Sequence, residues 1–216
     1  MLKNLLTAYS GEGATDRAFL GNIIFRTLER LVLESDHHID IEIPTWYGIA
    51  KGLTIASVAL KAGKNGMQLL FAHADTDSKD YDKAFAERFK PAMDQLAAQS
   101  EYCPIVVPVL VMQETEAWML ADIDVLLKEL GGRLKKQDLQ LSPNPESYAN
   151  PKKQLDIIIR KANANQRRDF GIKKANLYLP LSNNVSLKKL DRLLSYQKFV
   201  TATRVALVQI GYLRPA

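Results

Sequence analysis

The sequence predicts an α/β fold, with a mostly parallel four-stranded sheet flanked by helices and a helical extension toward the C-terminus. Two observations lead to this class. Short apolar runs alternate with longer segments of helical periodicity four times in the first 121 residues, as in parallel sheets covered by helices. The last of these runs, PIVVPVLVM at 104–112, is apolar throughout, which is typical of a strand buried on both faces.

Each element of the first half follows from its own pattern. The strands are predicted at 4–9, 38–43, 67–74 and 104–112, where the residues are continuously apolar or alternate with polar ones. The helices between and after them are predicted at 15–33, 49–62, 81–99 and 113–121, where apolar residues recur every three or four positions.

The pattern changes at Gly131-Gly132. From there to about residue 150 the chain is polar and contains prolines, which favours a loop-rich insertion. A helix is predicted at 151–163, opened by a proline in its first turn, and two more at 186–194 and 196–210. We therefore expect an α/β core at residues 1–127 and a basic loop and helical extension at 128–216, packed on the core.

Composition limits the class of protein. Apolar residues make up 47% of the 216-residue chain, enough to fill a core, and the one cysteine, Cys103, cannot form a disulfide within the chain. We find no signal-peptide pattern and no apolar run of about 18 residues, the length that a membrane span requires. We expect a cytoplasmic protein without a membrane partner.

Charge is distributed unevenly along the chain. Residues 1–127 contain 11 Lys and Arg against 18 Asp and Glu, whereas residues 128–216 contain 18 against 6. An acidic half followed by a basic half indicates a metal site beside a surface that binds a polyanion such as nucleic acid. Two solvated faces that happen to differ in charge are the alternative.

An apolar run ends in Asp75-Thr76-Asp77. Side chains alternate along a strand, so Asp75 and Asp77 can point the same way. Paired carboxylates are usually tolerated because a divalent cation lies between them or because one is protonated. The alternative is an ordinary polar loop, in which Asp is common.

Further carboxylates follow other predicted strands. Glu12 and Asp16 come after the first strand, and Glu114 and Glu116 after the fourth. Functional sites of parallel sheets lie at the carboxyl ends of the strands, so these groups would converge if the first, third and fourth strands are neighbours. Oxygen ligands of this kind select Mg²⁺ or Mn²⁺.

Carboxylate-held divalent ions suit phosphoryl transfer, and a nearby cation would help to neutralise the transition state. Lys152 and Lys153, at a helix start, are the first candidates for that cation, although any single lysine can simply be a solvated surface residue. The remaining basic residues expected to contact nucleic acid are Arg160, Lys161, Arg167, Arg168, Lys173 and Lys174.

The combination of Gly11-Glu12-Gly13-Ala14-Thr15-Asp16 after a strand and Asp75-Thr76-Asp77 at the end of another resembles the TOPRIM domain. TOPRIM domains have a Rossmann-like sheet and occur in topoisomerases, primases and nucleases, including the OLD (overcoming lysogenization defect) nucleases. Glu12 with Asp16 is most similar to the OLD-type variant, in which both groups serve metal binding.

The run from Gln113 to Asp122, QETEAWMLAD, resembles a signature of TOPRIM-like bacterial proteins often encoded beside ATPase genes in phage-defence or mobile loci. Asn150-Pro151-Lys152 fits that family too. The resemblance implies that Glu12 is the general acid/base or a metal ligand, that Lys152 is an electrostatic stabiliser, and that Trp118 is structural. The implied metal ligands are Asp16, Asp75, Asp77, Glu116 and, less directly, Glu114.

These inferences predict a Mg²⁺- or Mn²⁺-dependent nuclease that cleaves DNA or RNA. The chain has no Gly-x-x-x-x-Gly-Lys phosphate loop, so we expect a separate ATPase subunit as partner; a homo-oligomer is left open. One alternative is a non-catalytic nucleic-acid-binding or regulatory subunit of an ATPase complex. Another is a phosphatase with an aspartate nucleophile, but that class places its paired aspartates after the first strand rather than the third.

Overall fold

The computed structural model describes residues 2–11, 13–48, 54–76, 80–98, 104–132, 134–164 and 171–215. The chain divides into two compact units. The first comprises Met1–Ala74, Asp80–Leu110 and Lys198–Ala216, and the second comprises Asp75–Lys79 and Val111–Gln197. This division differs from the boundary expected after residue 127, because 111–127 belongs to the second unit and the last 19 residues return to the first.

A four-stranded sheet with the order β4-β2-β5-β6 forms the centre of the fold. Its strands are β2 (Thr7–Gly11), β4 (Thr45–Gly48), β5 (Leu69–Thr76) and β6 (Ile105–Met112). β2 pairs in parallel with both β4 and β5. Ile105 N donates to Gln68 O, and Gln113 N donates to Thr76 Oγ1, so β6 runs in the same direction as β5. The predicted class of parallel strands flanked by helices is confirmed, and β2, β5 and β6 are neighbours.

A second, two-stranded sheet replaces part of the predicted pattern. The run predicted as one strand at 4–9 is divided at Leu6 into β1 (Leu2–Leu5) and β2. β1 pairs in parallel with β3 (His38–Ile41). The strand predicted at 38–43 is therefore not the neighbour of β2 in the central sheet. That place is taken by β4, whose sequence Thr-Trp-Tyr-Gly was not predicted as a strand.

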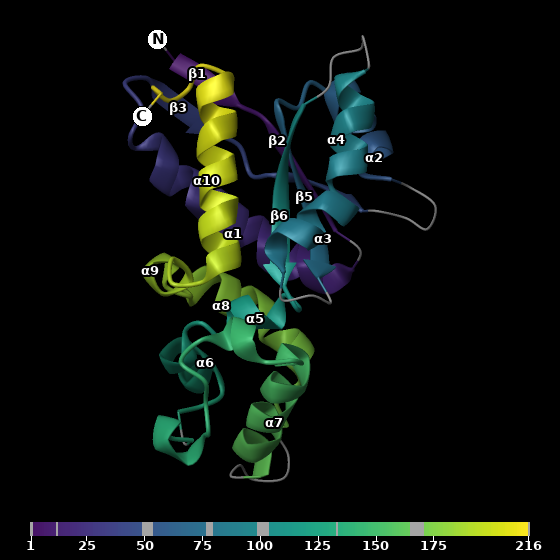
Figure 1. Cartoon of the computed structure of the whole chain (residues 1–216). Helices are drawn as coiled ribbons and strands as arrows, with labels where there is room; N and C mark the ends of the chain where they lie inside the picture. Colours follow the sequence, from purple (N-terminus) through teal and green to yellow (C-terminus); the bar gives the residue numbers. More distant parts are fainter. Residues whose placement is uncertain are drawn as a thin grey trace. The chain divides into compact units, whose positions relative to one another are not determined.

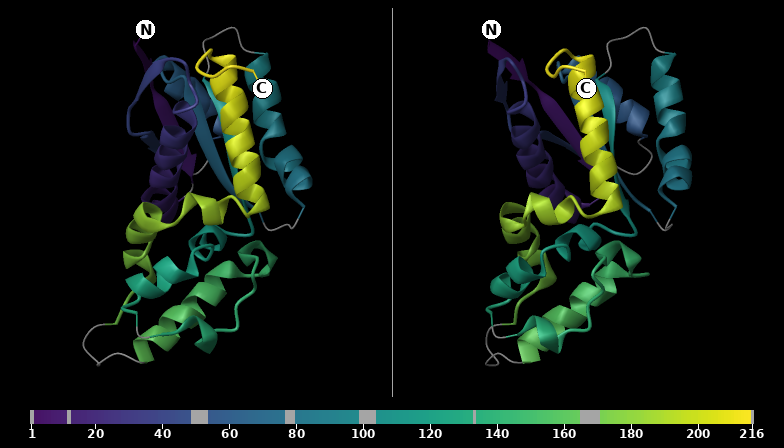
Figure 2. Two further views of the ribbon diagram at one scale, coloured as in Figure 1. Left: turned by 90° about the vertical axis from the view of Figure 1, so that its left-hand side faces the viewer. Right: turned by 60° about the vertical axis from the view of Figure 1, so that its left-hand side comes forward.

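Helices cover both sides of the sheet in the first unit. They are α1 (Ala14–Val32), α2 (Ile55–Lys64), α3 (Tyr81–Arg88), α4 (Lys90–Ala97) and the later part of α10 (Leu194–Gln209). α1 and α10 lie on one side, and α2 and α4 lie on the other (Figures 1 and 2). Phe71 of β5 meets Phe199 of α10 edge to face, with ring centroids 5.9 Å apart.

The single helix predicted at 81–99 is two helices. Phe89 separates α3 from α4, and Pro91 is the second residue of α4. Proline has no N–H to donate to the carbonyl four residues earlier, so the first helix ends before it. The buried ring of Phe89 stacks on Phe85 at 6.0 Å.

The second unit is built from short helices. The α-helices are α5 (Glu116–Met119), α6 (Ile123–Glu129), α7 (Pro151–Ala164), α8 (Tyr178–Asn184), α9 (Leu187–Leu190) and the first residues of α10, and the 3-10 helices are η1 (Lys136–Asp138), η2 (Pro145–Ser147) and η3 (Lys174–Asn176). α7 has the bounds that its proline and periodicity predict, within one residue, whereas α8 was not predicted. Leu126, Leu155, Ile158 and Trp118 are completely buried in this unit.

None of the helices within the described ranges combines the length and the apolar character that crossing a membrane would require.

Candidate functional site

Asp16 is held at the carboxyl end of the central strand β2. It lies in the first turn of α1, and its Oδ2 accepts a hydrogen bond of 3.0 Å from Gly13 N. Its side chain is almost fully buried. A Cβ at Gly11 would lie 2.9 Å from the Cβ of Asp16, a separation that side chains do not tolerate. Glycine at position 11 is therefore what allows this carboxylate to lie against the end of the strand.

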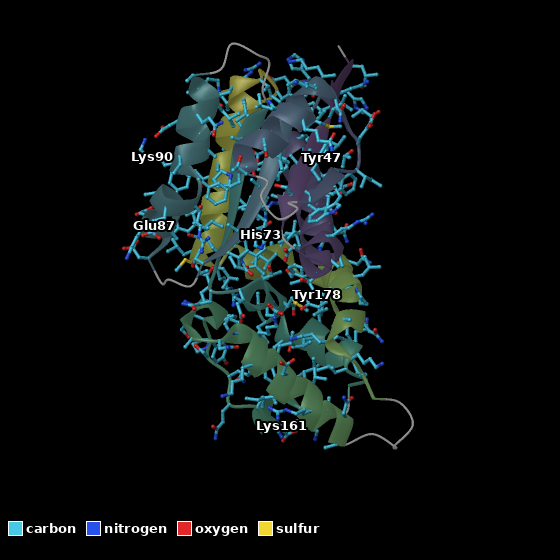
Figure 3. All side chains as sticks on the ribbon, turned by 90° about the vertical axis from the view of Figure 1, so that its right-hand side faces the viewer. Tyr47, His73, Glu87, Lys90, Lys161 and Tyr178 are labelled. Carbon is cyan, nitrogen blue, oxygen red and sulfur yellow. The ribbon has the colours of Figure 1, made fainter. Side chains whose placement is uncertain are left out.

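His73 lies beside Asp16 in the first unit, where Figure 3 labels it on β5. The side chain of His73 is 3% exposed. Its Nε2 is 3.7 Å from Asp16 Oδ1, and its Nδ1 is 2.9 Å from the carbonyl oxygen of Val109. A carbonyl only accepts hydrogen bonds, so Nδ1 carries a proton and Nε2 faces the carboxylate.

Sequence reasoning missed His73 as a site residue. The register pairs Ser10 with Ala72, which places His73 next to the end of β2. A signal was present in the sequence: a histidine interrupts an apolar strand two residues before Asp75, so both side chains lie on the same face of β5. Only the pairing of β2 with β5 brings His73 beside Asp16 of α1.

Asp75 and its neighbours belong to the second unit. The side chain of Asp75 is exposed and accepts a long hydrogen bond of 3.4 Å from Thr115 Oγ1. Gln113, where the chain leaves β6, has a positive φ of 66°, a left-handed conformation that non-glycine residues adopt at some cost. Its backbone N–H donates to the buried Thr76 hydroxyl at 3.4 Å, which ties the end of β6 to the end of β5.

The carboxylate of Glu114 accepts a hydrogen bond from the backbone at the N-terminus of α7. Its Oε2 accepts a hydrogen bond of 3.0 Å from Lys152 N, and Asn150 Oδ1 accepts one of 2.6 Å from Lys153 N. Pro151 has no N–H to satisfy. Together these residues cap the N-terminus of α7, which is the physical role of the Asn-Pro-Lys sequence.

Glu116 is buried among polar groups of the second unit. It accepts a hydrogen bond of 2.8 Å from the Tyr178 hydroxyl, and Lys174 Nζ lies 3.9 Å from the same carboxylate oxygen. Lys174 also pairs with Asp156 at 3.1 Å. The carboxylate of Glu116 therefore joins α5 to η3 and α8; Tyr178 is labelled on α8 in Figure 3.

The predicted basic residues separate into groups. Lys153, Arg160 and Lys174 line one cavity of about 430 Å³. Lys161 instead donates to the carbonyl oxygen of Asp138 at 3.1 Å, and Lys152 and Lys173 have exposed side chains. Arg167 and Arg168 lie outside the described residues.

The predicted six-carboxylate group is only partly described. Glu12 and Asp77 lie outside the described residues. Among the residues that are described, no three or more His, Cys, Asp or Glu side chains gather as a potential metal cluster. Of the other four predicted ligands, Asp16 belongs to the first unit, whereas Asp75, Glu114 and Glu116 belong to the second.

Comparison with known proteins gives one match. No curated protein and no solved structure matches the chain. The sequence profile of DUF4276, described as a domain of unknown function, matches residues 11–202. The match includes the Asp16 turn, the β5 strand with His73 and Asp75, and the whole second unit. The chain therefore belongs to the DUF4276 family.

Proposed function

We propose that the protein is a Mg²⁺- or Mn²⁺-dependent phosphodiesterase that acts on nucleic acid. The observation that carries the proposal is the placement of Asp16. A nearly buried carboxylate lies at the carboxyl end of the central parallel strand, fixed by Gly13 N–H and faced by His73. This is the edge at which parallel α/β sheets hold their functional groups, and the resemblance to TOPRIM nucleases assigns metal binding to the same residue.

The chemistry of the donors fits a hard divalent cation. Asp16 and Asp75 offer carboxylate oxygens, and Asp75 is exposed beside a neutral hydroxyl, that of Thr115. Mg²⁺ commonly takes one or two protein carboxylates and keeps several waters. Asp16 and Asp75 are therefore each proposed as a metal ligand, and Glu12 and Asp77 as further ligands. The bound ion would supply charge stabilisation for the phosphoryl group.

Glu114 and Glu116 are given a smaller part in this proposal than the resemblance implies. One caps α7, and the other receives the Tyr178 hydroxyl near the Lys174 ammonium. Carboxylates committed to such contacts shape the second unit rather than bind a metal directly. Glu12 remains the proposed general acid/base, and Lys152 the proposed electrostatic stabiliser.

The wider setting of the proposal comes from the sequence. A chain without a phosphate loop of its own would act with a separate ATPase subunit in the cytoplasm. The resemblance of the QETEAWMLAD run to TOPRIM-like bacterial proteins implies that this takes place in a bacterial defence or mobile-element system. The basic second half would contact the nucleic-acid backbone without reading its sequence, because phosphate contacts carry no base information.

Hydrolysis of labelled DNA and RNA, single- and double-stranded, tests the proposal. The full chain is incubated with Mg²⁺, with Mn²⁺ or with EDTA, and Asp16→Asn is compared with the wild type. Asparagine keeps an acceptor for Gly13 N–H, so the turn is retained. We expect cleavage that requires the metal and falls at least about 100-fold in Asp16→Asn, because a metal ion supplies several kcal/mol of stabilisation.

The matched control is Asp94→Asn. Asp94 is an exposed aspartate of α4 that pairs with Lys90 at 2.9 Å within the same helix, and its loss should leave cleavage unchanged. Equal rates for Asp16→Asn and the wild type would refute the assignment of Asp16.

A non-catalytic role in nucleic-acid binding is the second candidate. It is favoured by the structural partners of Glu114 and Glu116, which leave fewer carboxylates for chemistry than the sequence pattern implies. Binding of nucleic acid without cleavage of any tested substrate, in the presence of both metals, would support this role over the catalytic one.

A further inference from the structure

One face of α7 borders a cavity that is rich in positive charge. The cavity of about 430 Å³ lies within the second unit and is lined by Lys153, Asp156, Ile159, Arg160 and Lys174. We call these five residues the α7 cradle. Ile159 is largely buried, whereas Lys153 and Arg160 are exposed, so the cradle has an aliphatic wall and a charged rim.

Helical geometry explains why only some of the basic residues meet here. Positions 153, 156 and 160 are spaced by three, four and seven residues, and such positions share one face of a helix. Lys161 falls about 80° from Lys153 around the axis, on the side away from Asp156 and Arg160, and Lys152 does not line the cavity. Lys161 is engaged with the carbonyl oxygen of Asp138.

The third basic group comes from another segment and is held in place. Asn163 Nδ2 donates to Ile172 O at 2.9 Å, and Ile172 N donates to Asn163 Oδ1 at 2.9 Å. This double hydrogen bond fixes the chain just before η3 against α7. Lys174, two residues later, then reaches Asp156 at 3.1 Å and Glu116 at 3.9 Å.

The charge of the cradle does not cancel. Three cationic side chains surround a single lining carboxylate, that of Asp156, which is already paired with Lys174. Lys153 and Arg160 form no ion pair with an acidic side chain elsewhere in the described ranges. Arg160 Nε donates only weakly, to Asp156 O at 3.4 Å. Two cationic groups on one rim are thus available to an anion.

We propose that the α7 cradle binds backbone phosphates of a single nucleic-acid strand, with Lys153 and Arg160 as the direct contacts and Lys174 holding Asp156 away from them. The inference rests on the proposed function for its ligand class, because a nuclease or a nucleic-acid-binding subunit must hold a phosphodiester chain. It also narrows the predicted basic surface, since Lys161 is assigned no contact with the backbone phosphates.

Salt-dependent binding tests the cradle separately from catalysis. Affinity of the full chain for a fluorescein-labelled single-stranded DNA oligonucleotide is measured by anisotropy in EDTA over a series of salt concentrations. The slope of log K against log salt is negative, and each lost phosphate contact reduces its magnitude by about 0.7 for single strands. We expect Lys153→Ala and Arg160→Ala each to reduce the magnitude of the slope by about this amount, and the double variant by about twice as much.

Three controls make the test specific. Lys161→Ala and Lys188→Ala remove the same charge from α7 and α9 of the same unit and should keep the wild-type slope. Arg160→Lys should keep it too, because the charge remains. Equal slopes for cradle and control variants, or no binding by the wild type at low salt, would overturn the proposal.

The two proposals fail in different ways. If the wild type binds the oligonucleotide but cleaves no substrate, and the Lys153 and Arg160 variants show the expected change in salt slope, the catalytic function is contradicted and the cradle proposal is supported. Metal-dependent cleavage with cradle variants that bind like the wild type contradicts the cradle alone.

Discussion

Trp118 shows how one residue of the QETEAWMLAD run acts. Its side chain is completely buried, and its indole Nε1 donates a hydrogen bond of 2.7 Å to Ser195 Oγ. The ring also meets Tyr196 edge to face at 5.2 Å. The resemblance implies a structural role for this residue, and its contacts within the second unit are to the first turn of α10. A buried indole needs a partner for its N–H, and Ser195 provides it.

The pKa of Tyr81 is raised in the folded protein. Burial of its phenol, aided by the negative charge of Asp82, raises its pKa to about 12. The neutral form is favoured in the folded protein. A raised pKa means that stability is complete below the unfolded pKa of about 10 and falls as the pH rises through 12.

We therefore predict that the unfolding free energy of the wild type falls by up to about 2–3 kcal/mol more than that of Tyr81→Phe between pH 10 and 12. Urea denaturation at pH 9 and pH 12 measures the difference, and absorbance at 295 nm follows the tyrosinate. Identical alkaline losses in the two proteins would contradict the prediction.

Among the elements, α10 begins on an unusual cap. The buried carboxylate of Glu146 accepts from Leu194 N at 2.9 Å, from Ser195 N at 3.1 Å, and from the Ser195 hydroxyl. The first N–H groups of a helix lack partners within it, and a carboxylate there also complements the helix dipole. The loop predicted at 131–150 therefore contains the residue that positions the start of the last helix.

The N-terminus of α7 is capped by Glu114, and this leads to a test of its role. We predict that Glu114→Ala lowers the unfolding free energy by about 1 kcal/mol, the usual effect of losing a cap, and leaves Mn²⁺ affinity unchanged. Urea denaturation and calorimetry with Mn²⁺ measure the two effects. Glu114→Gln, which retains an acceptor for Lys152 N, should recover most of the stability.

A loss of Mn²⁺ affinity without a loss of stability would instead make Glu114 a metal ligand. If Mn²⁺ affinity falls in Glu114→Gln while stability does not, the carboxylate charge serves a metal rather than the helix.

At the scale of the whole molecule, the chain passes between its two units at four points, after residues 74, 79, 110 and 197. β5, β6 and α10 each contribute residues to both units. Each unit is thus made of segments that are separated in the sequence. This explains why a single boundary after residue 127, inferred from a change in composition, differs from the structural division.

Metal binding should be visible in the stability of the whole chain. A ligand that binds only the folded state adds about 2.7 kcal/mol at 100 times its Kd, which raises Tm by several degrees for a chain of this length. We predict that Mn²⁺ raises Tm of the wild type and of Asp94→Asn, but not of Asp75→Asn. Differential scanning calorimetry measures it, and an equal shift in Asp75→Asn would remove that residue from the proposed ligands.

The sequence by itself determined the α/β class, the order of β2, β5 and β6 along the chain, and the bounds of α1 and α7. These features depend on periodicity, apolar runs and caps, which are local properties of the chain. It also singled out Asp16 and Asp75, because both follow predicted strands.

Only the tertiary structure decided the partners of the side chains. His73 became a neighbour of Asp16 through the pairing of β2 with β5, and Glu116 became a partner of Tyr178, 62 residues away. The face of α7 on which each basic residue lies decides whether it lines the cavity. Lys174, from a later segment, joins Lys153 and Arg160 there by pairing with Asp156. Residue type and spacing identify a carboxylate or a lysine, but which group satisfies it depends on contacts between distant segments, and these form only when the chain packs.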